Sequence, residues 1–99
     1  MSFKLSDDED VNMLFDEIAS KLITDLGYSE DSAITSCEQY YKSFTDEEYC
    51  NEIGVPVQDD DFFFHESASG IALRIYYYLN LKGDPDPHKF IEWRSSRRA

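Results

Sequence analysis

Cysteine and histidine are scarce in this sequence, with two of each in 99 residues. Cys37 and Cys50 lack the Cys-x-x-Cys spacing that is typical of zinc and redox sites. Both fall at apolar positions of predicted helices, so we expect buried free thiols, with a disulfide between them as the alternative. The sequence also lacks an Asn-Gly or Asp-Gly pair and any sustained alternation of apolar and polar residues. No β-hairpin is therefore predicted.

Long apolar segments are missing as well. The run from Gly70 to Leu81 is interrupted by Arg74 and is too short to span a bilayer. The N-terminal stretch has no apolar core of the kind found in signal peptides. We therefore expect a soluble, cytoplasmic protein without membrane contact.

Basic residues are few, with 9 lysines and arginines against 21 aspartates and glutamates and a net charge of −12. The imbalance is confined to residues 1–66, which hold 18 acidic and 3 basic side chains, whereas residues 67–99 hold 3 acidic and 6 basic ones. Such a chain repels nucleic acid and anionic membranes and attracts cationic surfaces. Solubility alone is the alternative explanation, although the charge exceeds what solubility needs.

The composition is 41% hydrophobic and 15% aromatic, which is typical of a globular chain. Apolar residues at helical spacing predict helices over 7–26 and 30–43, a short helix after residue 45, a main helix from Glu66 or Ser67 to Leu81, and a last helix from Asp86-Pro87 through Trp93. The expected fold is an all-α single domain, 1–99, arranged as a bundle of four to five helices.

Helix ends are marked by local signals. Capping boxes at Ser6–Glu9 and Thr45–Glu48 predict two helix starts, and Ser29 predicts a third. Gly27 and Gly54 predict two C-terminal ends. At the chain's end, Arg94, Arg97 and Arg98 follow the last helix, where positive charge is favoured.

The stretch 59–81 organises the rest of the chain, because it joins three aspartates and three phenylalanines to the most apolar helix. At 100° per residue, Ala68, Ala72, Ile75 and Leu79 share one face, while Leu73 and Tyr77 lie opposite. A helix apolar nearly all round is either central in a bundle, its second face covered by the C-terminal helix, or covered by a partner. Residues 58–64 are either a loop or a turn of helix started by the aspartates.

No complete catalytic or metal-binding motif is found in the sequence. His65-Glu66 begins like a zinc-protease motif, but Ser69 stands where the second histidine belongs, so His65 reads as a partly exposed residue at a helix entry. The segment 84–88 lacks the glycine and glutamate of a calcium loop. No glycine-rich phosphate loop or nucleophile elbow is present. We expect a non-enzyme with no metal, cofactor or catalytic residue.

The surplus of aromatic residues next to carboxylates predicts a contact surface for a basic protein partner. Aromatic side chains dominate interface hot spots, and charge speeds association. The candidate partner-binding residues are Asp59, Asp60, Asp61, Glu47 and Glu48 for steering, and Phe62, Tyr76 and Tyr77 as anchors.

Three features also resemble the colicin-type nuclease immunity proteins, which are small, acidic, helical inhibitors of basic toxin domains. They are Asp59–Asp61 shortly before the Ser67-Ala-Ser-Gly-Ile71 segment, the paired tyrosines, and Trp93-Arg94. The tyrosines here follow that segment, whereas they precede it in the family. The resemblance implies an immunity protein or antitoxin in a bacterial cytoplasm, with no residue role carried over.

Two other functions fit the same sequence. One is a DNA mimic whose carboxylates take the place of phosphates in a nucleic-acid-binding protein. The other is a homodimer joined through Leu73 and Tyr77, with its role elsewhere.

Overall fold

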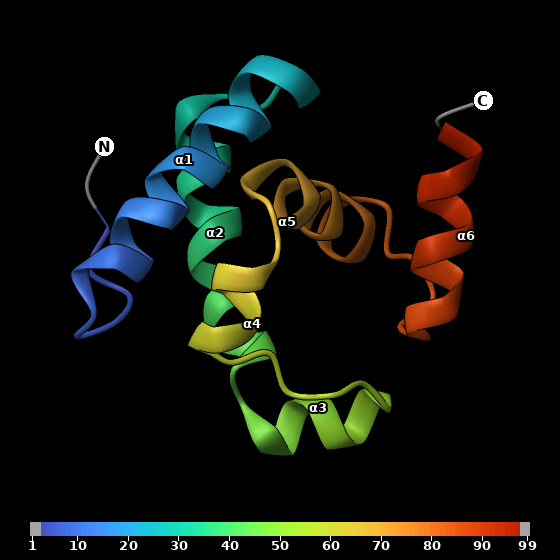
Figure 1. Cartoon of the computed structure of the whole chain (residues 1–99). Helices are drawn as coiled ribbons and strands as arrows, with labels where there is room; N and C mark the ends of the chain where they lie inside the picture. The colour runs from blue at the N-terminus through green and yellow to red at the C-terminus, as the bar shows by residue number, and fades with distance from the viewer. Residues whose placement is uncertain (1–2, 98–99) are drawn as a thin grey trace.

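The computed structural model describes residues 3–97, and in that range the secondary structure consists of helices joined by loops, without a strand. Its elements are α1 (Glu9–Leu26), α2 (Glu30–Phe44), α3 (Glu47–Ile53), α4 (Asp60–His65), α5 (Ala68–Ile75), the π-helix η1 (Tyr76–Asn80) and α6 (Pro87–Arg97) (Figure 1). The predicted all-α fold is confirmed. The α-helix beyond the four to five expected is α4, in the segment that the sequence left open as a loop or a helical turn.

The core lies where α1 packs against α2 and α5. These three helices bury most of the apolar stripes that their sequence spacing predicted. The largest fully buried side chains include Val11, Phe15, Ile18 and Leu22 from α1, Cys37, Tyr40 and Phe44 from α2, Phe63 from α4, and Ile71 and Ile75 from α5. Ala68 and Ala72 are buried with them, and Leu79 is half-buried against the same core.

Most predicted helix ends are confirmed, because they depend on local chemistry. The Ser29 hydroxyl accepts a hydrogen bond from the Ser32 amide, and Gly27 and Gly54 adopt left-handed φ angles of 76° and 77°. Asp86 accepts from the His88 amide and begins α6, as the Asp-Pro pair predicted. Arg98 lies outside the described residues.

Two predicted N-caps are wrong by one or two residues. Asp8, rather than Ser6, caps α1 by accepting from the Asp10 amide, while the Ser6 hydroxyl accepts from the Asp8 amide. Asp46, rather than Thr45, caps α3, because the Thr45 hydroxyl donates to the Tyr41 carbonyl oxygen of α2 at 2.6 Å. In both places a carboxylate takes the capping position in preference to the hydroxyl.

The main helix expected over 66–81 is divided in the structure. Glu66 is extended, so α4 ends there, and the Ser67 hydroxyl starts α5 by accepting from the Gly70 amide at 2.9 Å. Beyond Ile75 the helix widens into η1, whose end is marked by a bond from the Leu81 amide to the Tyr76 carbonyl oxygen. His65 therefore lies in the last turn of α4, which corrects its predicted place at a helix entry.

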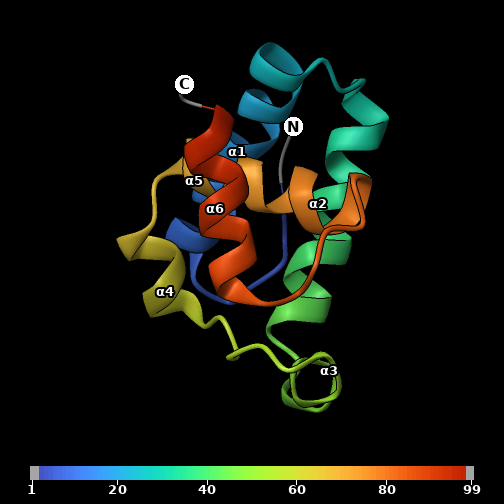
Figure 2. The same cartoon turned by 90° about the vertical axis from the view of Figure 1, so that its right-hand side faces the viewer.

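The second face of this segment is covered by α6, as the bundle interpretation predicted (Figure 2). Tyr77 is only 6% exposed, with its ring centroid 5.4 Å from that of Phe90 and 5.1 Å from that of Trp93. The expectation that Tyr77 projects outward as an anchor or a dimer contact is therefore wrong. The helical wheel placed Tyr77 correctly on the face opposite Ala68 and Ala72, and α6 rather than a partner covers that face.

Both cysteines are buried and free, which confirms the first of the two alternatives. Burial, with Asp16 and Glu38 nearby, raises the pKa of Cys37 to about 12. Among residues 3–97, no helix is long and apolar enough to cross a membrane.

Candidate functional site

The aspartates of 59–61 stand at the N-terminus of α4, held in place by the segment just before them. Gln58 is buried. Its backbone N–H donates to the Phe44 carbonyl oxygen at 2.8 Å, and its side-chain oxygen accepts from the Tyr40 hydroxyl. Asp59 then accepts from the Phe62 amide at 2.9 Å as the helix cap. These contacts fix the carboxylates against the C-terminal half of α2.

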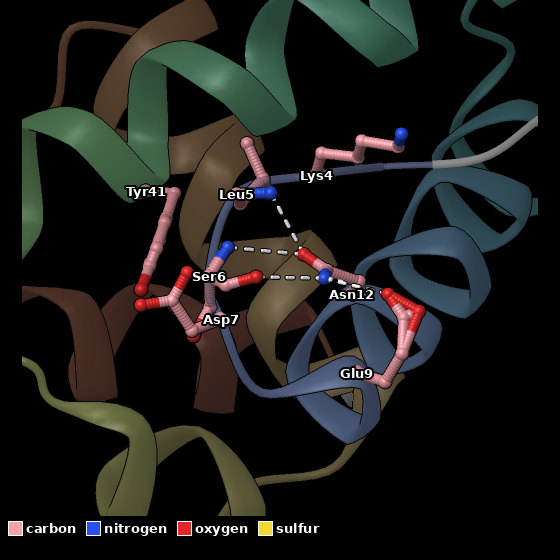
Figure 3. Close-up of a pocket in the computed structure, with 7 residues that line it drawn as sticks. All are labelled: Lys4, Leu5, Ser6, Asp7, Glu9, Asn12 and Tyr41. Carbon is pink, nitrogen blue, oxygen red and sulfur yellow. Dashed lines mark hydrogen bonds between the residues drawn. The ribbon is translucent and has the colours of Figure 1, made fainter.

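The N-terminal segment is fixed beside the same half of α2 by Asn12, a buried polar residue of α1. Its side-chain oxygen accepts from the Leu5 and Ser6 amides at 2.7 and 3.1 Å, and its nitrogen donates to the Ser6 carbonyl oxygen at 2.9 Å (Figure 3). The nitrogen also donates to Glu9 at 3.0 Å, so all of the amide's polar atoms are used. A buried amide satisfied in this way holds the loop in one conformation.

The two acidic segments meet at Tyr41. The Tyr41 hydroxyl lies 3.4 Å from one carboxylate oxygen of Asp60, and the Ser6 hydroxyl lies 3.5 Å from the other. Tyr41 lines one hollow together with Asp7 (Figure 3). It lines a second hollow together with Asp59–Asp61. We call Tyr41, Asp7, Asp59, Asp60 and Asp61 the Tyr41 surface.

The ring of Tyr41 is half-buried and rigidly placed. Its centroid lies 5.6 Å from that of Phe15 and 5.8 Å from that of Phe63, so the core supports it from below. Burial raises the pKa of Tyr41, the hydrogen bond with Ser6 opposes the shift, and Asp60 and Asp7 add to it. The phenol therefore stays neutral at physiological pH. Its hydroxyl lies among four carboxylates, which suits an arginine or lysine of a partner.

Glu47 and Glu48 are exposed in the first turn of α3. Thr45, which precedes that helix, lines the hollow shared by Tyr41 and Asp59–Asp61, so the acids of α3 follow directly from the Tyr41 surface along the chain. The apolar side chain of Val57 lines this hollow as well and is 42% exposed. The predicted steering carboxylates are thus grouped on neighbouring elements.

Phe62 has a structural role that the sequence did not predict. It is half-buried, and the guanidinium of Arg74 lies 5.2 Å from its ring centroid and 4.5 Å from that of Phe90. The same guanidinium pairs with Glu66 at 3.1 Å. Arg74 of α5 thus contacts both α4 and α6, and the ring of Phe62 is its contact in α4.

Tyr76 is far from the Tyr41 surface. Its ring lies between Tyr28, which follows α1, and Trp93 of α6, at centroid distances of 6.5 and 6.0 Å. This is the end of α1 and α2 opposite to α4 (Figure 1). Tyr76 is half-buried there, and Tyr77 is under α6, so neither of these two predicted anchors lies beside Asp59–Asp61.

His65 is exposed, and its Nδ1 lies 2.7 Å from the Asp61 carbonyl oxygen within α4. In the described range, 3–97, no three histidine, cysteine, aspartate or glutamate side chains are grouped as metal ligands would be. The polar groups of this region serve helix capping and surface charge.

The residue that sequence reasoning missed is Tyr41. Tyr41 lies in the helix that apolar spacing predicts over 30–43, and its ring packs on Phe15 and Phe63, but it also lines two surface hollows. Asp7 was likewise assigned only to a helix cap. The position of this tyrosine at the edge of an apolar stripe is the sequence signal that could have identified it as a surface residue, because such side chains keep a polar tip in water. No family model, curated protein or solved structure matches this chain.

Proposed function

We propose that this chain is a non-enzymatic inhibitor that binds a basic protein, most specifically an immunity protein or antitoxin that blocks a nuclease-like toxin domain in a bacterial cytoplasm. The observation that carries the proposal is the gathering of Asp7 and Asp59–Asp61 around the half-buried ring of Tyr41. An aromatic group ringed by carboxylates is complementary to an arginine-rich surface.

The parts of the Tyr41 surface have separate roles in this proposal. The exposed carboxylates of Asp7, Asp59 and Asp61, with Glu47 and Glu48 of α3, steer a cationic partner and raise the association rate. Tyr41, which packs against the core, and Val57, which is 42% exposed in the same hollow, replace the predicted tyrosines as anchors. Anchors of this kind slow dissociation and so set the lifetime of the complex.

A charge-reversal experiment tests the proposal. Asp7→Lys/Asp61→Lys alters two exposed carboxylates that cap no helix, so the fold is expected to survive. The tagged variant and the parent chain are used to capture partners from a lysate of the native host, and each captured basic protein is then measured as a purified pair. We expect the variant to bind at least about tenfold more weakly, mainly through a slower association rate.

The matched control is Glu17→Lys/Glu38→Lys, which makes the same charge change at exposed positions of α1 and α2. It is expected to bind within about threefold of the parent. Equal losses in both variants would show that only net charge matters, and the surface assignment would fail. Binding that competes with duplex DNA, falls steeply with salt and survives Tyr41→Ala would instead favour the DNA mimic.

A further inference from the structure

A further accessible hollow lies away from the Tyr41 surface, between α3 and the connection from η1 to α6. We call this hollow the α3 groove. The residues that line it are almost all apolar or aromatic, and they are Phe44, Tyr49, Ile53, Tyr78, Leu79, Lys82, Gly83 and Pro85. Phe44 forms its floor, being 1% exposed, while Tyr49 on one wall is 37% exposed. The groove therefore offers apolar surface that the fold leaves uncovered.

Aromatic packing makes this groove a fixed shape. The ring of Phe44 stacks on that of Tyr40 at 4.6 Å and lies 5.1 Å from that of Tyr78 and 6.0 Å from that of Tyr49. The volume of about 200 Å³ is below the roughly 300–1,000 Å³ of small-molecule sites. It suits one large side chain inserted from a partner, as in a hot-spot pocket.

The charge around the groove decides which partner fits. From Asp46 to Ile53 the chain carries four carboxylates and no basic residue, and Asp84 and Asp86 flank Pro85 on the other side. Lys82 is the one cation among the residues that line the groove. A segment that inserts an apolar side chain here must therefore carry its own positive charge on both sides of that side chain.

We propose that the α3 groove binds a basic segment of a protein partner, with one large apolar or aromatic side chain in the groove and flanking lysines or arginines over the carboxylates of α3. The inference rests on the proposed function only in taking the partner to be basic. It adds a second contact, separate from the Tyr41 surface, and it states the sequence pattern that the partner carries there.

A second copy of this chain is the less favoured occupant. Its helix α6 is basic and has Ile91 46% exposed, so it carries the required pattern. However, a net charge of −12 makes two copies repel each other.

Peptide titration followed by amide chemical shifts tests the inference on the whole chain. The probe is a capped pentapeptide with one tryptophan between two pairs of lysines. Two matched peptides replace the tryptophan by alanine or the lysines by glutamates. We expect the tryptophan peptide to cause saturable shifts at Tyr49, Ile53 and Leu79. The alanine peptide is expected to bind at least about tenfold more weakly, and the glutamate peptide is expected not to bind.

Protein variants locate the binding. Glu48→Lys/Glu52→Lys is expected to weaken binding of the tryptophan peptide by about tenfold. Glu17→Lys/Glu38→Lys makes the same charge change elsewhere and is expected to change this affinity by less than about threefold. Equal binding of the tryptophan and alanine peptides, or shifts confined to Tyr41 and Asp60, overturns the groove. Shifts at the groove and α6 that grow with protein concentration, without peptide, assign the groove to a second copy. Loss of toxin binding in Asp7→Lys/Asp61→Lys tests the Tyr41 surface alone and leaves these outcomes unchanged.

Discussion

The Tyr41 hydroxyl lies 3.4 Å from the Asp60 carboxylate, and this pair joins two parts of the chain that are separated by α3 and the loops on either side of it. Asp60 also lies 3.5 Å from the Ser6 hydroxyl, which brings the N-terminal segment to the same point. Both distances are long for oxygen-to-oxygen hydrogen bonds, so each adds little stability. Their significance is positional, because they mark where the acidic segments converge.

The first prediction separates the ring of Tyr41 from its hydroxyl. Tyr41→Phe is expected to cost less than about 1 kcal/mol of unfolding free energy, because the hydroxyl lies a long 3.4 Å from the Asp60 carboxylate oxygen. Tyr41→Ala is expected to cost about 2–3 kcal/mol, because the ring packs on Phe15 and Phe63 and is half-buried. Urea denaturation measures both values. A phenylalanine variant as unstable as the alanine variant would mean that the hydroxyl, not the ring, holds α4 to α2.

The second prediction concerns the ion pair of Arg74 and Glu66, which is only 14% and 22% exposed. Arg74→Met leaves the Glu66 carboxylate without its cation and removes the guanidinium from the faces of Phe62 and Phe90, so we expect a loss of about 2–3 kcal/mol. Glu66→Gln in the Arg74→Met background is expected to cost less than in the parent.

Lys89 and Glu92 supply the control for that cycle, since their ion pair is on the surface, with side chains 54% and 69% exposed. Lys89→Met is expected to change the unfolding free energy by less than about 0.5 kcal/mol. The same urea measurements serve for all four variants. Strict additivity of the Arg74 and Glu66 changes would argue that the two side chains do not interact.

The third prediction tests the contact of Gly83 with Tyr77. A Cβ atom at position 83 would lie 2.4–2.6 Å from carbons of the Tyr77 ring, so the ring or the connection to α6 has to move. Gly83→Ala is expected to cost about 1–3 kcal/mol and to change the fluorescence of Trp93, whose ring lies 5.1 Å from that of Tyr77. Tyr77→Leu is expected to reduce the further cost of Gly83→Ala. Ser95→Ala, at an exposed position of α6, is the neutral control.

The fourth prediction follows from the pKa of Cys37, which burial raises from 9.0 to about 12. The folded state binds the thiol proton more tightly than the unfolded state, so this stabilisation is complete below pH 9 and is lost as the pH rises to 12. In that window the thiol alone lowers the unfolding free energy by about 1 kcal/mol per pH unit. Burial also raises the pKa of Tyr40, which steepens the alkaline loss.

Cys37→Ala removes that titrating group at a cost of about 1 kcal/mol at neutral pH. Its unfolding free energy is expected to fall less steeply than that of the parent between pH 9 and 11, as measured by urea denaturation at several pH values. Parallel curves for the two proteins would contradict the raised pKa. Neither thiol is expected to react with a thiol reagent until the protein unfolds, because Cys50 is buried as well.

The helices and most of their ends were predictable because their causes are local. Ser29, Gly27, Gly54 and the Asp86-Pro87 pair each act on amides or carbonyls within one turn, and the apolar stripes of α1 and α2 follow from helical spacing alone. The N-caps at Ser6 and Thr45 were displaced because a neighbouring aspartate competes for the same amides.

The sequence by itself determined the all-α fold, the buried thiols and the concentration of negative charge in residues 1–66, since these depend on composition and local spacing. Only the tertiary structure decided which carboxylates stand together and which aromatic ring they surround. The long-range contacts of Asn12 and Gln58 set the two acidic segments beside Tyr41, and no local pattern encodes them. The burial of Tyr77 was decided in the same way, because α6 packs Phe90 and Trp93 over the face that carries its ring.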